Sequence, residues 1–416
     1  MSGGDEDPPA RASVGASWLD EIPARLAALE AARLTRRRRA VRPAGGAHLW
    51  VDGRRLLAFC SNDYLGLSQH PALRAAAQAA VDAYGVGSGA SPMVSGHSEA
   101  NAALERELAA FVALPRALYF YAGYSTNAGV VPALVGAGDA LFSDALNHAC
   151  LIDGARLSRA TVHRYAHADL GALSDALAGS PARRKLVISD TVFSMDGDVA
   201  DLRGLLALCE RHDALLMIDD AHGFGVLGPD GRGALAAAGL TGAAASRRVL
   251  YMATLGKAAG VAGAFVAGDD ALVEWVLQKT RSYTFATAAP AMLAESVRAA
   301  LRVMANDAAP LARLLGHVAH VRDALPRAVA GSGWTLLPSD TAIQALVIGS
   351  NEDALGVMAH LAECGFWVPA IRPPTVPEGT ARLRIALSAA HTRADVEALL
   401  GALRAAAQAV GISART

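Results

Sequence analysis

Lysine is scarce in this sequence, which carries 38 basic residues but only three lysines, Lys185, Lys257 and Lys279. Arginine supplies the same positive charge, but its guanidinium stays protonated, whereas a lysine amine can lose its proton and attack a carbonyl group. A retained lysine is therefore a candidate for chemistry. The alternative is that all three are chance survivors in an arginine-rich composition.

Paired cysteines, a charged and apolar leader, and long apolar runs are also lacking. The apolar runs are interrupted by Gly, Asp and Arg and fall short of the roughly 18 residues that a membrane span needs. We therefore expect no membrane partner, and a cytoplasmic protein with reduced thiols. The four cysteines lie far apart, at Cys60, Cys150, Cys209 and Cys364.

An excess of charge of either sign is absent, since 38 basic residues balance 39 acidic ones. This balance does not favour nucleic acid or an anionic membrane surface as a partner. The run from Arg36 to Arg39 is the local exception. Such a run is usually a solvated helix face, although an anionic ligand with several phosphates could also bind it.

The chain is long and apolar enough for two packed domains, with 416 residues of which 53% are hydrophobic. Residues 1–16 lack periodicity and are predicted to be disordered. An amphipathic helix is predicted from Trp18 to about Arg39, and a hairpin over 48–60 with its turn at Asp52 and Gly53. The predicted divisions are a tail (1–16), an N-terminal arm and hairpin (17–60), a large domain (61–290) and a small C-terminal domain (291–416).

Short apolar runs alternate with helical segments through the large domain, which predicts an α/β fold. Unbroken apolar strands separated by helices form a mostly parallel sheet with helices on both faces. The later segments predict a smaller α+β domain, with helical sequence over 291–329 and a final helix after Thr392. The predicted strands are 117–123, 140–144, 185–190, 214–220, 248–256 and 263–268 in the first domain, and 341–349, 365–371 and 381–388 in the second.

The stretch YGVGSGA at 84–90 has the G-x-G-x-x-A spacing of a dinucleotide-binding loop, and Glu105 follows 20 residues after Gly85. Such a loop must follow a strand and open a helix. Here the preceding PALRAAAQAAVDAY is predicted to be helical, and Glu105 lies within another predicted helix. We therefore interpret the stretch as a flexible loop where backbone can approach a ligand closely.

Two further sequence patterns resemble a phosphate-binding loop and a metal site, but the spacing of their residues does not fit either kind of site. The segment LGKA at 255–258 would need glycine at Tyr251 and Ser or Thr at Ala258 to form a phosphate loop. His163 and His167 are four apart in a segment that alternates like a strand, which separates their side chains. No metal site is expected.

Four polar side chains follow the predicted strands at their carboxyl ends: Ser194, Asp219, His222 and Lys257. Ligands on open α/β sheets bind at this edge. Each residue alone has a structural explanation, such as a turn carboxylate or a core histidine. Together they suit a cofactor with an aldehyde, a ring nitrogen, a phenolic oxygen and a phosphate, which describes pyridoxal 5′-phosphate (PLP).

Several stretches together carry a family likeness. They are FCSNDYLGLSQHP, SDALNHACL, VFSMDGD, DDAHGFGVLG and TLGKA, in that order along the chain. From about Trp18 to the final helix, the sequence resembles the α-oxoamine synthases, a branch of the fold-type I PLP-dependent transferases. Within them, AIRPPTVPEGTARLRIALSAAHT is similar to the branch that serves biotin biosynthesis.

The resemblance implies roles around the cofactor. Lys257 would hold it covalently and later move the α-proton of the substrate. Asp219 would keep the pyridine nitrogen protonated, which makes the ring an electron sink. His222 would contact the phenolic oxygen with Ser194 near the same edge, and His148 would stack on the ring.

The phosphate would lie against Gly123 and Tyr124, which follow a strand and open a helix. Thr254 would join them there.

Substrate residues are also implied. Asn62 and Arg384 would hold the amino-acid carboxylate, with Arg384 preferred over Arg382 on the same strand face. Thr375 would lie beside the substrate, and Arg36 would contact the acyl substrate or product.

The implied reaction joins L-alanine to a pimeloyl thioester, carried by coenzyme A or an acyl carrier protein, and releases CO₂ and free thiol. A homodimer is also implied, and the apolar arm from Trp18 is consistent with an interface. Met93 and His97 depart from the family pattern in a loop that would line the acyl entrance, which leaves acyl chain length and carrier open.

Two alternatives remain at this point. One is a glycine-using relative, either 2-amino-3-ketobutyrate CoA ligase or 5-aminolevulinate synthase, which the Arg372-Pro373-Pro374 stretch disfavours. The other is a non-catalytic thioester-binding or scaffolding protein, which the presence of Lys257, Asp219 and His148 disfavours.

Overall fold

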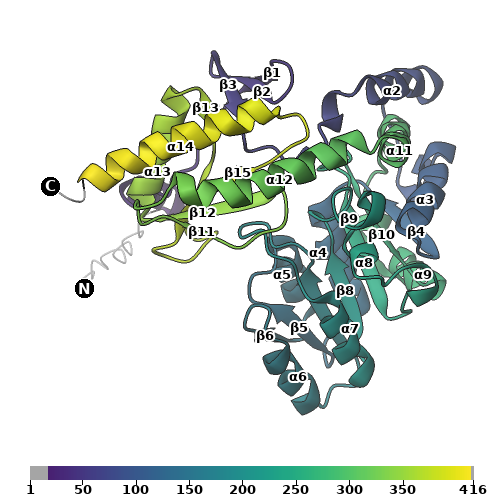
Figure 1. Ribbon diagram of the computed structural model, residues 1–416. Coiled ribbons are helices and arrows are strands. Elements are labelled where there is room, and N and C mark those ends of the chain that lie inside the picture. Colours follow the sequence, from purple (N-terminus) through teal and green to yellow (C-terminus); the bar gives the residue numbers. More distant parts are fainter. Residues whose placement is uncertain (1–16, 414–416) are drawn as a thin grey trace, which may run out of the picture.

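A seven-stranded sheet forms the centre of the larger domain (Figure 1). The computed structural model describes residues 17–413, so the prediction for residues 1–16 lies outside the described residues. The strand β10 is antiparallel to both of its neighbours, and the remaining pairs are parallel, which confirms the mostly parallel sheet. The strands in spatial order are β4 (Arg116–Phe120), β10 (Ala264–Gly268), β9 (Val249–Thr254), β8 (Leu215–Asp219), β7 (Lys185–Asp190), β5 (Ala140–Asp144) and β6 (Thr161–Tyr165).

Helices cover both faces of this sheet, because its central strands bury side chains on both sides. All five residues of β5 are buried, and Asp201 caps the start of a covering helix by accepting the N–H of Gly204 at 2.9 Å. Separate apolar cores lie on the two faces. One face carries α4 (Gly123–Leu134), α5 (Ala149–Ser158) and α9 (Asp270–Lys279), and the other α3 (Glu99–Val112), α6 (Leu170–Gly179) and α7 (Leu202–Arg211).

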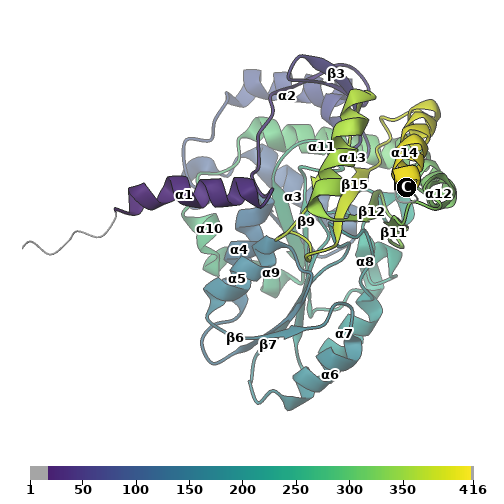
Figure 2. The same ribbon diagram turned by 90° about the vertical axis from the view of Figure 1, so that its left-hand side faces the viewer.

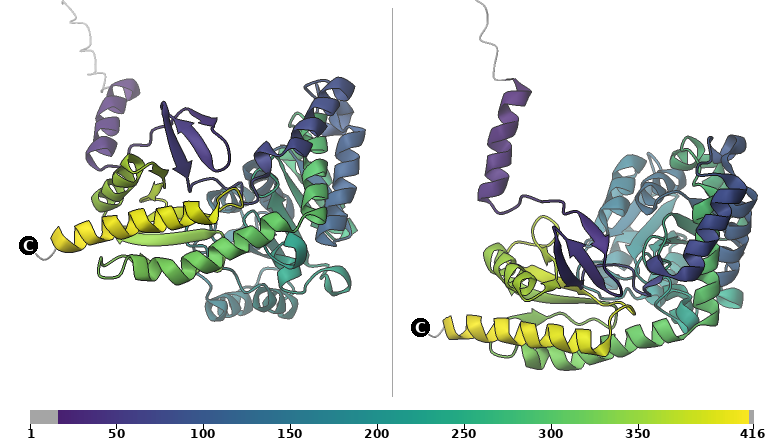
Figure 3. Two further views of the ribbon diagram at one scale, coloured as in Figure 1. Left: turned by 45° about the horizontal axis from the view of Figure 1, so that its top comes forward. Right: turned by 90° about the horizontal axis from the view of Figure 1, so that it is seen from above.

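A four-stranded sheet and long helices form the smaller C-terminal domain. Helices α12 and α14 lie side by side along this sheet (Figure 3), whereas α11 (Ala291–Asn306) packs on α2 (Pro71–Tyr84) and α3. The domain boundaries drawn from the sequence stay predictions. The elements are β11 (Thr335–Leu336), β12 (Ile343–Gly349), β15 (Ala381–Ala386), β14 (Ala370–Ile371), α12 (Ala309–Ala328), α13 (Asn351–Glu363) and α14 (Arg393–Ser413).

The predicted hairpin is present, with β2 (His48–Val51) and β3 (Arg54–Ala58) joined at Asp52 and Gly53. These two residues have φ of 47° and 83°, as a tight two-residue hairpin turn requires. The strand β1 (Val41–Pro43) pairs with β2, and β13 (Phe366–Trp367) pairs with β3. The N-terminal hairpin therefore shares a sheet with a segment of the small domain.

The first helix is shorter than the sequence pattern predicted. Helix α1 covers Trp18–Ala31, and the extension to Arg39 is wrong. Arg33 has φ of 56°, and the N–H of Leu34 bonds back to the carbonyl of Leu29 at 2.8 Å, which ends the helix. Figure 2 shows α1 projecting from the rest of the chain, and none of its residues is buried.

Short elements complete the fold. Tyr84 ends α2, and Glu105 lies within α3, so the glycine-rich stretch is indeed a loop between two helices. No helix within residues 17–413 is long and apolar enough to cross a membrane. The short elements are α8 (Ala234–Ala237), α10 (Arg281–Thr284), η1 (Leu67–Gln69), η2 (Pro92–Gly96), η3 (Pro229–Gly231) and η4 (Gly242–Ala244).

Candidate active site

A cavity of about 200 Å³ lies at the carboxyl ends of the parallel strands. Asp219 is the last residue of β8, Asp190 of β7 and Thr254 of β9, and Lys257 follows β9 by three residues. All eight residues that the sequence assigned to the cofactor line this one cavity. The lining is Gly123, Tyr124, His148, Cys150, Asp190, Ser194, Asp219, Ala221, His222, Met252, Thr254 and Lys257.

The carboxylate of Asp219 is buried and held on both oxygens. The side-chain amide of Asn127 donates to Oδ2 at 2.6 Å, and the backbone N–H of Ala221 donates to Oδ1 at 2.9 Å. These donors compensate for part of the cost of burying a charge. The site thus presents an oriented negative group, to which a protonated ring nitrogen can bind.

The amine of Lys257 points at His222, with Nζ 2.9 Å from Nε2. Burial lowers the pKa of the Lys257 amine, although Asp219 and Asp190 act in the opposite direction. Burial and the charge of Lys257 hold the pKa of His222 well below its usual value. Both effects favour a neutral amine beside a neutral imidazole, so Lys257 is suited to nucleophilic and basic chemistry.

His148 lies at the first turn of α5, where Nδ1 accepts the N–H of Cys150 at 3.3 Å. Its own backbone N–H donates to Oδ2 of Asp190 at 2.6 Å. Burial lowers the pKa of His148 against the opposing effect of Asp219, so the ring is favoured in its neutral form. Burial and the nearby charge of Asp219 raise the pKa of Asp190 well above its ordinary value.

The phosphate end predicted from the sequence is a helix N-terminus. Gly123 is the first residue of α4, directly after β4, and a Cβ there would lie 3.4 Å from both Met252 Cε and Thr254 Oγ1. The hydroxyl of Tyr124 donates to Asp153. Free N–H groups at the start of α4 and the Thr254 hydroxyl are suited to an anion. In this structure the hydroxyl donates to the Gly263 carbonyl at 3.0 Å.

Asn62 and Arg384 lie against each other, although they are 322 positions apart in the sequence. Both terminal nitrogens of Arg384 lie 3.2 Å from Oδ1 of Asn62, and Nε donates to the Ser194 carbonyl at 2.5 Å. Arg382 shares the strand, but its guanidinium is engaged by Asp196. Of the two arginines, Arg384 is therefore the one that faces the residues of the cavity.

Arg36, the acyl candidate, and Thr375, which was predicted to lie beside the substrate, line a different and larger cavity and not the one that contains Lys257. Arg36 and Thr375 belong to a hollow of about 570 Å³ between the segment after α1 and the small domain, together with Arg33, Arg37, Arg39 and Arg372. Burial and the charge of Arg36 lower the pKa of Arg372. A concentration of guanidinium groups favours an anionic ligand here.

Metal binding finds no support among residues 17–413, where no cluster of three or more potential ligands occurs. His163 stacks on Phe142, with ring centroids 5.0 Å apart. His167 bridges Asp144 and Asp198 at 2.9 and 2.8 Å. The two histidines thus have separate structural partners, and His167 lies beyond the end of β6.

Two residues of the site were missed at the level of sequence. Asp190 ends the strand KLVISD, so the strand-end rule that selected Asp219 could have found it. Asn127 gives no such signal, because its contact with Asp219 joins positions 92 apart. Asp190 holds the backbone of His148 in place, and Asn127 holds the carboxylate of Asp219.

The residues present fit PLP. The cavity offers an amine at Lys257, an oriented carboxylate at Asp219, a neutral imidazole at His148 and a helix N-terminus at Gly123. These match the aldehyde, the ring nitrogen, the ring face and the phosphate of the cofactor.

Comparisons with known proteins identify the family. Residues 54–403 match the family described as aminotransferase class I and II. The 8-amino-7-oxononanoate synthases of Delftia acidovorans and Paracidovorax citrulli are 72% and 71% identical to this chain, over 93% of it in each case and over 96% and 94% of their own chains.

Similar solved structures include the serine palmitoyltransferase of S. paucimobilis with a bound PLP–myriocin aldimine. It has a TM-score of 0.86 at 28% identity, covering 95% of this chain and 98% of that one. The 8-amino-7-oxononanoate synthase of Francisella tularensis has a TM-score of 0.72 at 28% identity, covering 84% and 97%.

Proposed function

Because this chain belongs to the aminotransferase class I and II family, and within it to the α-oxoamine synthases, we propose that it is the PLP-dependent acyltransferase that forms 8-amino-7-oxononanoate in biotin biosynthesis. L-Alanine and a pimeloyl thioester would be joined, with release of CO₂ and free thiol. The observation that carries the proposal is the convergence of Lys257, Asp219 and His148 on one cavity.

When bound, PLP supplies an electron sink for the charge left by removal of the α-proton of the amino acid. The chain contributes the groups that make this sink effective. Asp219, fixed by Asn127 and Ala221, would hold a proton on the ring nitrogen of the bound cofactor by electrostatic attraction. His148, whose pKa is lowered by burial and whose backbone is fixed by Asp190, would pack on the ring face of the bound cofactor.

Lys257 moves the proton. Its amine is buried, its pKa is lowered, and it lies 2.9 Å from the neutral His222 ring. A neutral amine next to the α-carbon can take the α-proton onto Nζ, and an arginine at this position could not, because it stays protonated. This supports Lys257 as the base of the condensation.

The amino-acid carboxylate would bind at Arg384 and Asn62. Arg384 is 6% exposed, and its planar guanidinium can hold a carboxylate with two parallel hydrogen bonds. At present those N–H groups contact Asn62 Oδ1 at 3.2 Å, which is long for a charge-assisted bond. A carboxylate is therefore a better partner for them than the amide oxygen.

The acyl substrate would use the arginine-rich hollow that contains Arg36 and Thr375. A pimeloyl group ends in a carboxylate, and its carrier bears phosphate groups, so both ends of the thioester are anionic. The guanidinium groups of this hollow can bind either anion.

The test is to incubate the PLP-loaded protein with pimeloyl-CoA and either L-alanine or glycine, and to identify the product by mass. We expect 8-amino-7-oxononanoate from alanine and little product from glycine. A product formed from glycine alone would assign the chain to the glycine-using branch. No product from either amino acid, with PLP bound, would contradict the proposed reaction.

A homodimer is the expected assembly. Apolar side chains stand exposed on the 85–97 loop and after α10, with Val94 81% and Phe285 72% exposed. Ser91 Oγ donates to the Thr284 carbonyl at 2.8 Å, so these two segments form one surface. A second copy would cover it. Light scattering should give a mass near twice 42.8 kDa, and a monomer mass would contradict the expectation.

A further inference from the structure

Tyr64 is fully buried, and its hydroxyl lies between two residues of the site. The hydroxyl oxygen is 2.6 Å from Nδ1 of His222 and 3.2 Å from Oδ1 of Asn62. Through His222, whose Nε2 is 2.9 Å from Lys257 Nζ, the phenol is linked to the amine that performs the chemistry. Tyr64 itself does not line the cavity.

The hydroxyl has one proton and two possible acceptors. The amide oxygen of Asn62 has two lone pairs, and both terminal nitrogens of Arg384 already lie 3.2 Å from it. Nδ1 of His222 is closer, and no other side chain among the described residues is recorded as bonding to it. The proton of Tyr64 is therefore best placed on the side of His222.

We propose that Tyr64 is a positioning residue that sets the tautomer of His222. With Tyr64 donating to Nδ1, the single proton of the neutral imidazole must be on Nε2. His222 then presents an N–H donor to the cavity. Without the phenol, the ring can carry its proton on Nδ1 and turn a bare nitrogen to the cavity instead.

The tautomer matters because the atom that faces the cavity is Nε2. An N–H at this position can donate to the phenolic oxygen of PLP, whereas a bare nitrogen would repel it. This consequence rests on the proposed function. The tautomer itself is a property of the chain and can be measured without substrate. A wrong tautomer prediction can therefore be distinguished from a wrong assignment of the reaction.

The experiment is nitrogen-15 NMR of the histidine rings in the PLP-loaded protein and after removal of PLP. His222 signals are identified by their absence in a His222→Gln spectrum. We expect the proton on Nε2 in the wild type, and a shift of population toward the Nδ1-protonated tautomer in Tyr64→Phe. The wild-type measurement tests the proposal even if Tyr64→Phe folds poorly.

Visible absorbance gives a second readout. A hydrogen bond donated to the phenolic oxygen stabilises its negative charge. The oxygen then attracts less strongly the proton on the nitrogen that would join Lys257 to the cofactor, so the pKa of that proton is lower. The pH at which the cofactor band changes should therefore rise by about one unit in Tyr64→Phe. Tyr251→Phe is the matched control, because its equally buried hydroxyl donates to Asp220 at 2.7 Å, and it should leave the His222 signals unchanged.

Two results would overturn the proposal. One is wild-type His222 with its proton on Nδ1. The other is a folded Tyr64→Phe protein whose His222 signals and cofactor band match those of the wild type.

Discussion

At the level of single residues, the rarity of lysine has a chemical interpretation in Lys257. Its amine is enclosed by the cavity wall, close enough to Asp219 and Asp190 for their charges to act on it. The carboxylates favour the protonated amine and burial favours the neutral one, and burial is the larger effect. An amine whose pKa is lowered by burial gives up its proton more readily than a free lysine does, whereas a guanidinium stays protonated.

The substitution Lys257→Arg should therefore keep the charge and lose the chemistry. We expect condensation activity to fall by about 10²–10⁴-fold or more, and borohydride to link no cofactor to the chain. Mass spectrometry of the reduced protein measures the second effect. Lys279→Arg, at an exposed position, is the control and should behave like the wild type. Retention of covalent cofactor by the Lys257→Arg protein would exclude Lys257 as the attachment point.

At the level of elements, the contact between α3 and the edge strand β4 depends on a partly buried carboxyl group, with 17% of the Glu105 side chain exposed. Oε1 of Glu105 accepts the backbone N–H of Tyr119 at 2.9 Å. Burial raises the pKa of Glu105 to about 7, although this hydrogen bond and Arg116 counteract it. Because the folded-state pKa lies above the ordinary 4.5, the protonated form favours folding. Its stabilising effect is present below pH 4.5 and lost as the pH rises through about 7.

The substitution Glu105→Gln should remove this pH dependence, since the amide keeps an oxygen for Tyr119 but does not ionise. Relative to the wild type, the variant should gain up to about 3 kcal/mol of unfolding free energy between pH 5 and pH 8. Urea unfolding at the two pH values measures it. Glu99 is an exposed carboxylate on the same helix. Glu99→Gln should therefore differ from the wild type in unfolding free energy by the same amount at both pH values. If the unfolding free energy of Glu105→Gln, relative to the wild type, decreased between pH 5 and pH 8, the predicted direction of the pH dependence would be wrong.

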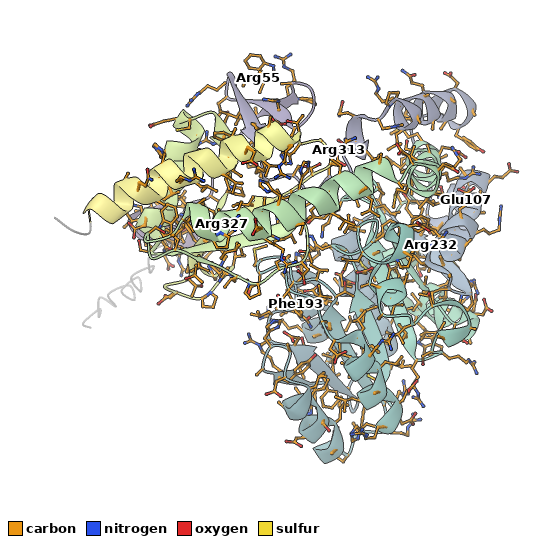
Figure 4. All side chains as sticks on the ribbon, in the orientation of Figure 1. Arg55, Glu107, Phe193, Arg232, Arg313 and Arg327 are labelled. Atoms are coloured by element: carbon orange, nitrogen blue, oxygen red, sulfur yellow. The ribbon has the colours of Figure 1, made fainter. Side chains whose placement is uncertain are left out.

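At the level of the whole molecule, the small domain closes over the site through β15. Arg384 bonds to the Ser194 carbonyl, and Arg382, 5% exposed at its side chain, pairs with Asp196 in the same loop. Phe193 begins this loop region and lies where the two domains meet (Figure 4). Arg384, the arginine proposed to bind the substrate carboxylate, is thus held in place by a contact between domains rather than within one.

The substitution Arg382→Met should loosen this junction. Loss of one partner of a largely buried pair should lower stability by about 2–3 kcal/mol, with a severalfold rise in KM for alanine because Arg384 is less well placed. Thermal unfolding and steady-state kinetics measure the two effects. Arg327→Met, which breaks an exposed pair with Asp323 on α12 (Figure 4), should cost less than about 1 kcal/mol and leave KM unchanged. Equal effects of the two substitutions on stability and KM would contradict the claim that the Arg382–Asp196 pair positions Arg384.

Local pattern in the sequence determined six of the seven strands of the large sheet, all except β6, together with the hairpin turn at Asp52 and Gly53 and the common edge of Ser194, Asp219 and Lys257. These features follow from side-chain periodicity and from the rule that parallel strands end on one side. They allowed the cofactor cavity to be predicted before any contact was known.

Tertiary structure decided what holds those residues. Asn127 contacts Asp219 across 92 positions, and Tyr64 contacts His222 across 158. Arg382 and Arg384 lie on the same strand, and only their partners distinguish them. Arg382 pairs with Asp196, whereas Arg384 bonds to the Ser194 carbonyl and to Asn62. The end of α1 was also mispredicted, because the periodic spacing of Leu34 continues beyond the residue where the backbone leaves the helix. Such contacts depend on how elements that are far apart in the sequence pack against each other. Local periodicity in the sequence carries no information about that packing.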